Sequence, residues 1–321
     1  MIKMDLTLLA SAIAPVNLRS CLIQRQGELI FEHYRRPQTV REIAKINSCT
    51  KSVLSALLCI AMDQGLLPEL STPASAFFPV LAAADDPRKR LITLEHLLTM
   101  TAGFSWTEFG GRNSFPHMTR TPDWIAYVLE QPMSDEPGTR MEYNSGVSQM
   151  LSHILLQTTG MPAAAFAEKY LFGPLGITQY EWETDPQGVH TGGFGLKLRP
   201  ADLMRFGQLY LDKGNWQGKQ LISSRLAERS VQPAIAVKDP WRGYYCWHWW
   251  ADSFTVSAPS DSPDSFDYFY ARGFGGQFVH VIPKLDMVVV LTHDNRKNTK
   301  YPDVFREFIA PLLAVEPVIK K

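Results

Sequence analysis

The clearest periodic pattern along the chain is an apolar stripe between residues 48 and 65. Apolar side chains recur there at helical spacing, and Gly65 is suited to end a helix. The stripe predicts a helix that packs against a core. In the first fifteen residues Asp5 interrupts the apolar positions, so this segment predicts an amphipathic helix rather than a signal peptide.

Short runs of β-branched and aromatic residues occupy the two ends of the chain. Residues 20–24 and 28–34 flank a Gly-containing turn and predict a β-hairpin. Near the C-terminus four further runs, separated by Gly, Pro or Asp, predict an antiparallel meander: residues 244–250, 266–272, 278–282 and 287–292. A helix is expected over residues 302–314.

Helices and loops predominate in the middle of the chain, from about residue 68 to residue 240. A short helix is expected to begin at residues 122–124. Apolar periodicity predicts two longer helices, one over residues 147–159 that Gly160 closes and one over residues 200–211 with Pro200 in its first turn.

These elements predict an α+β fold in one domain, residues 1–321. We expect the N- and C-terminal segments to join into one antiparallel sheet flanked by helices, with a mostly helical lobe inserted between them. The α/β lobe would comprise approximately residues 1–65 and 241–321, and the helical lobe approximately residues 66–240. A ligand cleft is expected at the junction of the two lobes.

Charge and composition narrow the class of protein. The 321 residues include 32 Lys and Arg against 32 Asp and Glu, so no net field attracts nucleic acid or an anionic membrane. No stretch reaches transmembrane length, and without a convincing signal peptide the expected location is the cytoplasm. The cysteines show no metal-ligand spacing and are expected to be buried free thiols: Cys21, Cys49, Cys59 and Cys246.

Ser48-Cys49-Thr50-Lys51 is the one SxxK sequence in the chain. Residues three apart on a helix lie on the same side, so the Lys51 amine can lie beside the Ser48 hydroxyl. A serine in the first turn also lies where free N–H groups and the helix dipole favour negative charge. The pattern indicates a nucleophilic serine. The alternative is a serine that caps the helix and a lysine in solvent.

A protonated lysine cannot accept the serine proton, so this hypothesis needs a lowered lysine pKa or a second base. The pKa of lysine is about 10.4 in water and falls when the amine is buried or lies near another cation. Tyr143, which follows the loop 136–138, could share the work if the lysine charge stabilised its phenolate. A loop tyrosine with a local hydrogen bond is the structural alternative.

Gly273, Gly275 and Gly276 lie between two strand-like runs. Because no helix follows them, they favour close approach of a strand to a ligand over a phosphate-binding loop. A backbone N–H from this edge could face the Ser48 N–H across an acyl oxygen and form an oxyanion hole. A plain β-bulge is the alternative.

Other chemistries lack their motifs in this sequence. GxSxG and HExxH do not occur, and the eight histidines have no ligand spacing, so no metal site is expected. Residues 192–195, Gly-Gly-Phe-Gly, lack the spacing and the preceding strand of a dinucleotide-binding loop.

The SxxK, tyrosine and Gly-rich strand motifs, in this order, resemble the serine β-lactamase and penicillin-binding transpeptidase superfamily. Residues 92–103 and 193–211 are also similar to segments of class C-like β-lactamases and related esterases. The resemblance implies a multi-lobe β-lactamase/transpeptidase-like fold and an acyl-enzyme mechanism without metal or organic cofactor. It also implies roles: Ser48 is the nucleophile, Lys51 its activator, Tyr143 the proton shuttle to the leaving group, and the backbone N–H groups of Ser48 and Phe274 the oxyanion hole.

Two positions depart from the family's pattern. Ser145 stands where the Tyr-x-Asn motif has asparagine, so the usual amide contact to substrate is shortened or lost. Ala271 stands where the family has a lysine or histidine that helps bind the carboxylate of penicillins and peptidoglycan peptides. Arg272, one residue further, is a candidate to compensate for the lost cation, but the alternation of a strand should point it to the other face. These departures make the chain similar to the branch that holds carboxylesterases and 6-aminohexanoate-dimer hydrolases.

We therefore expect a cofactor-free serine hydrolase that cleaves small esters or amides. The first alternative is a β-lactamase or DD-peptidase, and the second is a non-catalytic penicillin- or peptide-sensing module. The expected partner is a small-molecule ester or amide, with neither nucleic acid nor membrane, and no feature of the sequence indicates an oligomeric state.

The aromatic run at residues 244–250 predicts part of a substrate pocket. On a strand, Tyr245, Trp247 and Trp249 would share one face, and residues 244, 248 and 250 the other. One set is expected in the core, and the other would line an apolar acyl pocket together with Trp106 and Phe274. The predicted substrate-binding residues are Ser145, Gly273, Gly275, Trp106, Tyr245 and Trp247.

Overall fold

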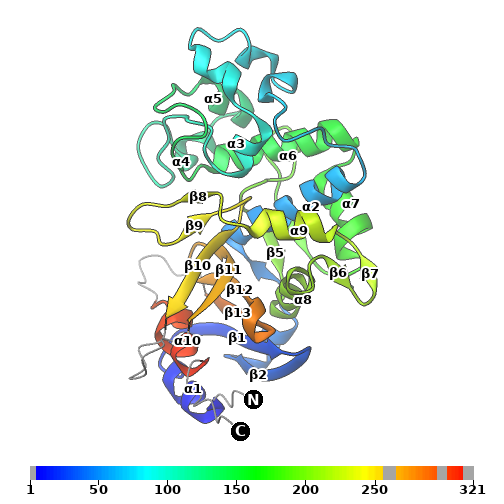
Figure 1. The fold of residues 1–321 in the computed structure, drawn as a ribbon, viewed down its shortest axis with the longest axis vertical. Coiled ribbons are helices and arrows are strands. Elements are labelled where there is room, and N and C mark those ends of the chain that lie inside the picture. The colour runs from blue at the N-terminus through cyan, green and yellow to red at the C-terminus, as the bar shows by residue number, and fades with distance from the viewer. Residues whose placement is uncertain (1–4, 256–264, 295–301, 314–321) are drawn as a thin grey trace.

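A computed structural model describes residues 5–255, 265–294 and 302–313. Within these ranges eight strands form one antiparallel sheet, and the first strand of the chain pairs with the last (Figure 1). This confirms the α+β fold and the sheet expected from the two ends of the chain. In spatial order the strands are β2 (Glu28–Tyr34), β1 (Leu18–Arg25), β13 (Met287–His293), β12 (Gln277–Ile282), β11 (Ser265–Gly273), β10 (Trp250–Thr255), β9 (Tyr244–Tyr245) and β8 (Ile235–Ala236).

Two hairpin turns of this sheet rely on left-handed backbone. Gln26 and Gly27 join β1 to β2 with φ angles of 51° and 76°, and a type I′ turn requires such a pair of positive values. Gly275 and Gly276, with φ angles of 77° and 86°, belong to the turn between β11 and β12. The Gly-rich segment is therefore a hairpin turn, and Phe274 lies within it.

Helices cover both faces of the sheet. α8 (Pro200–Leu211) packs on β12 and β13, and Gly207 lets it approach because a Cβ there would lie 2.8 Å from Cγ1 of Val279. The neighbouring His280 points to the opposite face, since successive side chains of a strand alternate. Its ring stacks 4.1 Å from that of Phe305, in the π-helical turn η8 (Phe305–Ile309).

The helix that bears the SxxK sequence is buried on all sides. η2 (Asn47–Cys49) is a 3₁₀ turn that leads directly into α2 (Thr50–Asp63), and every residue from Thr50 to Ala61 is buried. α2 contacts β11, α6 (Ser145–Thr159), α7 (Ala163–Ala167) and α9 (Ser224–Val231). α2 therefore lies in the core and connects the sheet to the helical lobe.

α6 is the centre of the helical lobe and contacts its neighbours α3 and α5 (Figure 1). The Asn144 side chain caps its N-terminus by accepting hydrogen bonds from the backbone N–H groups of Gly146 and Val147. Gly160, with a φ angle of 68°, closes its C-terminus. The remaining helices are α1 (Leu6–Ile13), α3 (Leu94–Leu98), α4 (Phe115–Met118), α5 (Trp124–Glu130) and α10 (Ala310–Leu313).

Short elements complete the described chain. The short strands are β3 (Ala44–Lys45), β4 (Glu181–Trp182), β5 (Leu196–Leu198), β6 (Asn215–Trp216) and β7 (Lys219–Gln220). The short helical turns are η1 (Pro37–Val40), η3 (Ala74–Ala76), η4 (Pro79–Leu81), η5 (Pro87–Leu91), η6 (Glu168–Phe172) and η7 (Pro283–Leu285).

The prediction of one strand over residues 244–250 is wrong. β9 ends at Tyr245, the chain reverses through residues 246–249, and β10 begins at Trp250, which pairs back onto Tyr245. His248 makes the turn with a φ angle of 58°, and the Cys246 N–H donates to the Trp249 carbonyl over 2.8 Å. The expected alternation of faces along this run therefore does not occur.

Other expectations need smaller corrections. α8 lies within the segment 66–240 that we assigned to the helical lobe, yet it packs on the sheet. The C-terminal helix is present from Phe305 to Leu313, while residue 314 lies outside the described residues. All four cysteines are buried and free, as expected. Among the described helices, none combines the length and apolarity needed to cross a membrane.

Replacing Gly207 by alanine tests the packing of α8. The added methyl group would meet Cγ1 of Val288 at 2.5 Å, and overpacking of this kind costs about 1–3 kcal/mol. Alanine favours a helix over glycine by about 1 kcal/mol, and the overpacking should outweigh this gain, so we expect a net loss of stability. Urea unfolding measures the difference, with Gln208→Ala on the same helix as the control. A stabilised Gly207→Ala protein would contradict this packing.

Candidate active site

The Lys51 amine is buried and has three oxygen neighbours. Its Nζ lies 2.9 Å from Oγ of Ser145, 2.9 Å from the carbonyl oxygen of Gly193 and 3.4 Å from Oγ of Ser48. The helical spacing of the SxxK sequence therefore does place the lysine beside the serine. The alternative of a lysine in solvent is excluded, since the side chain of Lys51 is almost completely enclosed.

Burial also changes the chemistry of this amine. It lowers the pKa of Lys51 from its usual value to about 8, although the nearby Glu108 carboxylate partly offsets the shift. A neutral amine has two N–H groups and one lone pair. The Gly193 carbonyl can only accept a hydrogen bond, and Ser145 accepts one at the same distance. Both N–H groups are then engaged, and the lone pair is left for Ser48.

Glu108 fixes the direction of the Ser145 hydrogen bond. Its carboxylate is buried and accepts from the Ser145 hydroxyl, from the Ser145 backbone N–H over 2.9 Å and from Nε1 of Trp106 over 2.9 Å. Because the Ser145 hydroxyl donates to Glu108, it can only accept from Lys51. Burial raises the pKa of Glu108, and the Lys51 charge opposes that shift. Lysine, serine and glutamate thus form one chain of hydrogen bonds.

Tyr143 lies on the other side of Lys51, whose Nζ is 4.6 Å from the centre of the phenol ring. Burial raises the pKa of Tyr143, and a hydrogen bond to Ser48 and the charge of Arg272 only partly oppose this. The phenol is therefore protonated at neutral pH. This geometry suits a proton donor, and the alternative of a phenolate base finds no support in it.

Gly273 allows β11 to approach the nucleophile. A Cβ at this position would collide with the Ile46 carbonyl oxygen and would lie 3.2 Å from the Ser48 backbone nitrogen. Asn47, with a φ angle of 49°, donates from its side-chain amide to the Phe274 carbonyl over 2.7 Å. This bond ties the turn that carries Ser48 to the turn that carries Phe274. The two backbone N–H groups predicted to form an oxyanion hole therefore belong to adjoining segments.

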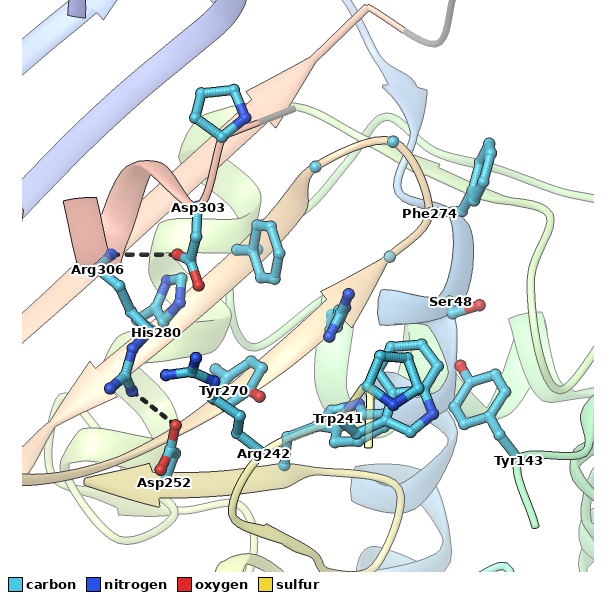
Figure 2. A pocket seen from close by; sticks show the side chains of 18 of the residues that line it. Ser48, Tyr143, Trp241, Arg242, Asp252, Tyr270, Phe274, His280, Asp303 and Arg306 are labelled. Atoms are coloured by element: carbon cyan, nitrogen blue, oxygen red, sulfur yellow. Dashed lines mark hydrogen bonds and ion pairs between the residues drawn. The ribbon is translucent and has the colours of Figure 1, made fainter. Parts of the chain in front are cut away.

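A cavity of about 480 Å³ opens beside Ser48 and Tyr143 (Figure 2). Of the residues predicted to bind substrate, Gly273 and Gly275 line it, as does Phe274. Ser145 lies beneath, where it contacts Lys51 instead of the cavity. Trp250, from the second set of the aromatic run, also lines the cavity. Next to it are three residues that we did not predict to line it: Trp241, Tyr270 and Arg272.

The aromatic residues expected to line the pocket are placed differently. Trp106, Tyr245 and Trp247 are buried, and none of them lines the cavity. The Trp106 indole N–H donates a hydrogen bond to Glu108. Tyr245 packs edge-on against the Tyr143 ring, with 6.2 Å between the ring centres. Because residues 246–249 form a turn, Trp247 enters the core. Trp106 and Tyr245 therefore contact residues of the site from within the core.

Arg272 was expected to point away from the site, and this is also wrong. Its side chain lines the cavity, whereas Ala271 is completely buried on the opposite face of β11. The alternation of the strand was inferred correctly, but the face that meets the cavity is the one that carries Arg272.

Sequence reasoning missed Glu108, Asn47 and the carbonyl of Gly193. Glu108 lies in a loop with no motif and meets Ser145 only through the fold. We considered the glycines at 192 and 193 only as a possible dinucleotide-binding loop. Glycine is needed at 193 because a Cβ there would lie 3.0 Å from the Lys51 Nζ. Among the described residues no group of three or more His, Cys, Asp or Glu could hold a metal ion.

Comparison with known proteins identifies a family and two relatives of this chain. The family profile described as Beta-lactamase matches residues 20–313. A lovastatin esterase of Penicillium rubens is 28% identical over 194 residues, which are 50% of this chain and 47% of that protein. Esterase EstB of Burkholderia gladioli is 24% identical over 237 residues, 66% of this chain and 59% of its own length. The chain thus spans about half to three-fifths of these relatives.

A solved structure supports the fold. A Bacillus anthracis protein provisionally assigned as a 6-aminohexanoate-dimer hydrolase superimposes with a TM-score of 0.75 at 20% identity, over 95% of this chain and 80% of that one. At this level of identity the likeness shows the fold alone.

Replacing Glu108 by glutamine tests the electrostatics of Lys51. The Glu108 charge favours the protonated amine, so its removal should move the pKa of Lys51 further below about 8. Carbon-13 NMR of labelled lysine side chains measures this value, and the signal missing from Lys51→Met gives the assignment. An exposed lysine such as Lys219 is the internal control. A Lys51 pKa that rises in Glu108→Gln would contradict the proposed balance.

Proposed function

Since this chain belongs to the Beta-lactamase family, we propose that it is a serine hydrolase that cleaves esters or amides through an acyl-enzyme on Ser48. The observation that carries the proposal is the Lys51 amine, whose two N–H groups are held by Ser145 and Gly193 while its lone pair is left for Ser48. The relatives named as esterases support the same class of reaction.

In the first step the Ser48 oxygen attacks the substrate carbonyl carbon and Lys51 accepts the hydroxyl proton. A pKa of about 8 suits this base, since part of the population is neutral near physiological pH and the protonated form remains accessible. The Ser145–Glu108 chain stabilises the ammonium that forms. The backbone N–H groups of Ser48 and Phe274 would stabilise the negative charge on the carbonyl oxygen.

In the second step the bond to the leaving group breaks, and that group needs a proton. Tyr143 is protonated and its hydroxyl points toward Ser48 (Figure 2), so it lies where the departing atom would be. It donates to the leaving group and is reprotonated from Lys51, whose Nζ lies over its ring. A water molecule then attacks the acyl carbon with Lys51 as base, which releases the acid and restores Ser48.

The relatives named as esterases are the reason to rank ester and amide substrates before β-lactams. Ala271 is completely buried and gives the cavity no cation, while Arg272 beside it lines the cavity. A β-lactamase or DD-peptidase is the alternative, and penicillin turnover that matches ester turnover would favour it. The other alternative is a module that senses penicillins or peptides without turning them over.

We also propose that the protein resides in the cytoplasm and acts on a small molecule. Four buried free cysteines suit a reducing compartment. The cavity volume of about 480 Å³ is typical of a small-molecule site. Thiol-specific labelling after fractionation of cells would test the location, and oxidised cysteines in the recovered protein would argue against it.

Ser48→Ala tests the nucleophile. We expect labelling by a fluorophosphonate at Ser48 of the unaltered protein, and a loss of p-nitrophenyl acetate hydrolysis of about 10³-fold or more in the variant. Ser145→Ala is a poor control because it alters Lys51, so Ser52→Ala on the same helix serves instead. Absence of labelling in folded protein would favour the sensing module, and retained hydrolysis in Ser48→Ala would refute the proposal.

Tyr143→Phe tests the proton donor. An alkoxide needs a proton to leave, whereas p-nitrophenolate leaves without one. The loss of kcat should therefore be about 10²-fold or more for an alkyl ester and much smaller for p-nitrophenyl acetate. Steady-state kinetics with ethyl and p-nitrophenyl esters of the same acid measures both. Equal losses for the two esters would show that Tyr143 has another role.

A further inference from the structure

The cavity beside Ser48 continues as a groove along one face of the sheet (Figure 2). Its lining follows β11 from Gly273 back to Tyr268, a span of about 17 Å at the usual rise of a strand. The bond that Ser48 attacks lies at the near end of this span. The groove is therefore long enough to bind parts of a substrate well beyond the reacting atoms.

A row of near-parallel rings leads from the proton donor along this groove. The Tyr143 ring lies 5.9 Å from that of Trp250, which lies 6.3 Å from that of Tyr270, measured between ring centres. Tyr270 and His280 are partners in the register of β11 and β12, and their rings are 5.3 Å apart. Within each pair the planes are at most 25° from parallel. Because Tyr143 is the proposed proton donor, the leaving group of a substrate would lie along this row.

Tyr270 and His280 carry polar groups that no part of the described chain satisfies. Both side chains line the cavity, and only 7% of Tyr270 and 3% of His280 are exposed. Among residues 5–255, 265–294 and 302–313, neither the Tyr270 hydroxyl nor a ring nitrogen of His280 forms a hydrogen bond, and Nδ1 of His280 is enclosed. Buried polar groups are almost always hydrogen-bonded, because an unpaired one loses its hydration without compensation. Two such groups beside a cavity therefore indicate a ligand.

Tyr268, two residues away on the same strand, provides the contrast. Its hydroxyl accepts from Nη1 of Arg306 over 2.8 Å and donates to a carboxylate oxygen of Asp252 over 3.2 Å. Arg306 and Asp252 also form an ion pair of 2.7 Å. The polar groups at the far end of the groove are thus paired within the protein. Those of Tyr270 and His280, nearer to Ser48, are the ones left for a ligand.

Both of these groups are neutral at physiological pH. Burial and the charge of Arg272 lower the pKa of His280 to about 3, and burial raises the pKa of the Tyr270 phenol. Because Nδ1 of His280 faces no acceptor, the ring proton is favoured on Nε2. The imidazole N–H and the phenol O–H are then two neutral donors on adjacent strands. They match a neutral oxygen with two lone pairs, such as that of a hydroxyl or an amide carbonyl.

The stretch between Ser48 and this pair is lined mainly by aromatic rings. Trp241, Trp250 and Phe278 belong to it. Tyr270 is three residues from Gly273, which corresponds to about 10 Å along the strand. A substrate that reaches the pair therefore needs an apolar spacer of about this length.

We propose that Tyr270 and His280 form a subsite for a neutral oxygen on the leaving group. The preferred substrates are then esters or amides whose leaving group carries a hydroxyl or an amide carbonyl about 10 Å from the bond that breaks, beyond an apolar spacer. This inference rests on the proposed hydrolase function. Tyr270 and His280 determine specificity in it and take no part in proton transfer.

Matched acetate esters test the proposal in the full-length protein. 8-Hydroxyoctyl acetate has a spacer of about 10 Å before its hydroxyl, and nonyl acetate replaces that hydroxyl by a methyl group. In Tyr270→Phe the ratio of kcat/KM for the hydroxyl ester to that for the methyl ester should fall by about fivefold or more, mainly through KM. His280→Phe, which keeps a ring for stacking, should lower the ratio as well. An unchanged ratio in Tyr270→Phe would overturn the proposal.

Spacer length and charge give two further comparisons. 4-Hydroxybutyl acetate and pentyl acetate are too short to reach the pair, so Tyr270→Phe should leave their ratio unchanged. An equal fall for the short and the long esters would contradict a subsite at this distance. 9-Acetoxynonanoate carries a carboxylate at the end of the long spacer. A higher kcat/KM for this anion than for 8-hydroxyoctyl acetate would show that the groove selects charge, and would also overturn the proposal.

Tyr244→Phe is the matched control, because it removes a phenol hydroxyl from an exposed ring outside the groove. Its ratios should equal those of the unaltered protein. The melting temperature gives an independent readout. Since the Tyr270 hydroxyl has no partner in the described chain, Tyr270→Phe should be at least as stable as the unaltered protein. A lowered melting temperature would show that this hydroxyl is bonded within the protein, which contradicts the subsite.

A binding measurement separates this inference from the hydrolase proposal. Calorimetry compares 1,8-octanediol with 1-nonanol, the free leaving groups, which cannot be hydrolysed. We expect the ratio of their affinities to fall by about fivefold or more from the unaltered protein to Tyr270→Phe. An unchanged ratio would refute the subsite, whatever the catalytic assays show. A fall in this ratio together with retained hydrolysis in Ser48→Ala would instead refute the nucleophile and leave the subsite standing.

Discussion

Lys51 is an amine enclosed by protein, and the chemistry of the site depends on how its surroundings balance its two protonation states. Burial disfavours the ammonium, since water no longer solvates the charge. Glu108, which reaches Lys51 through one serine hydroxyl, compensates for part of this loss. A stronger anion in direct contact would keep the lysine protonated, and an apolar pocket would keep it neutral. The observed arrangement leaves both states accessible, as a base that must accept a proton and return it requires.

One helix fixes both acceptors of the Lys51 amine. Ser145 is the first residue of α6, and the Asn144 cap sets its position. Further along α6, Gln149 accepts from the Gly192 N–H over 2.9 Å and donates to Asp185 over 2.8 Å, so it holds the loop that presents the Gly193 carbonyl. Gly192 has no room for a side chain because the Ser148 carbonyl lies against it. The lone pair of Lys51 is thus directed by two contacts that a single rigid element positions.

Sequence reasoning predicted what local signals encode. The helices at 147–159 and 200–211 were placed within two residues, since caps, Pro200 and Gly160 mark their ends. Ser48, Lys51 and Tyr143 could be assigned because they belong to short motifs. The prediction for residues 244–250 was wrong because aromatic residues favour strands and the left-handed residue of the turn is His248 instead of a glycine. We interpreted Ser145 only as a replacement of the motif's asparagine. Its role beside Lys51 was missed because its partner Glu108 is 37 residues away and belongs to no motif.

The two sides of the cavity come from different parts of the fold. η2, α2 and α6 supply the chemistry, while β10, β11 and the segment between β8 and β9 supply the wall that would select a substrate. On β11, a cation at position 271 would point into the core, whereas the one at position 272 lines the cavity. The wall can therefore change its charge without altering the surroundings of Lys51. Tyr143 contacts both sides of the cavity, since its hydroxyl points toward Ser48 and its ring packs on Trp241 and Trp250. Substitutions in the wall should therefore change the rate of the chemical step chiefly by moving the Tyr143 ring.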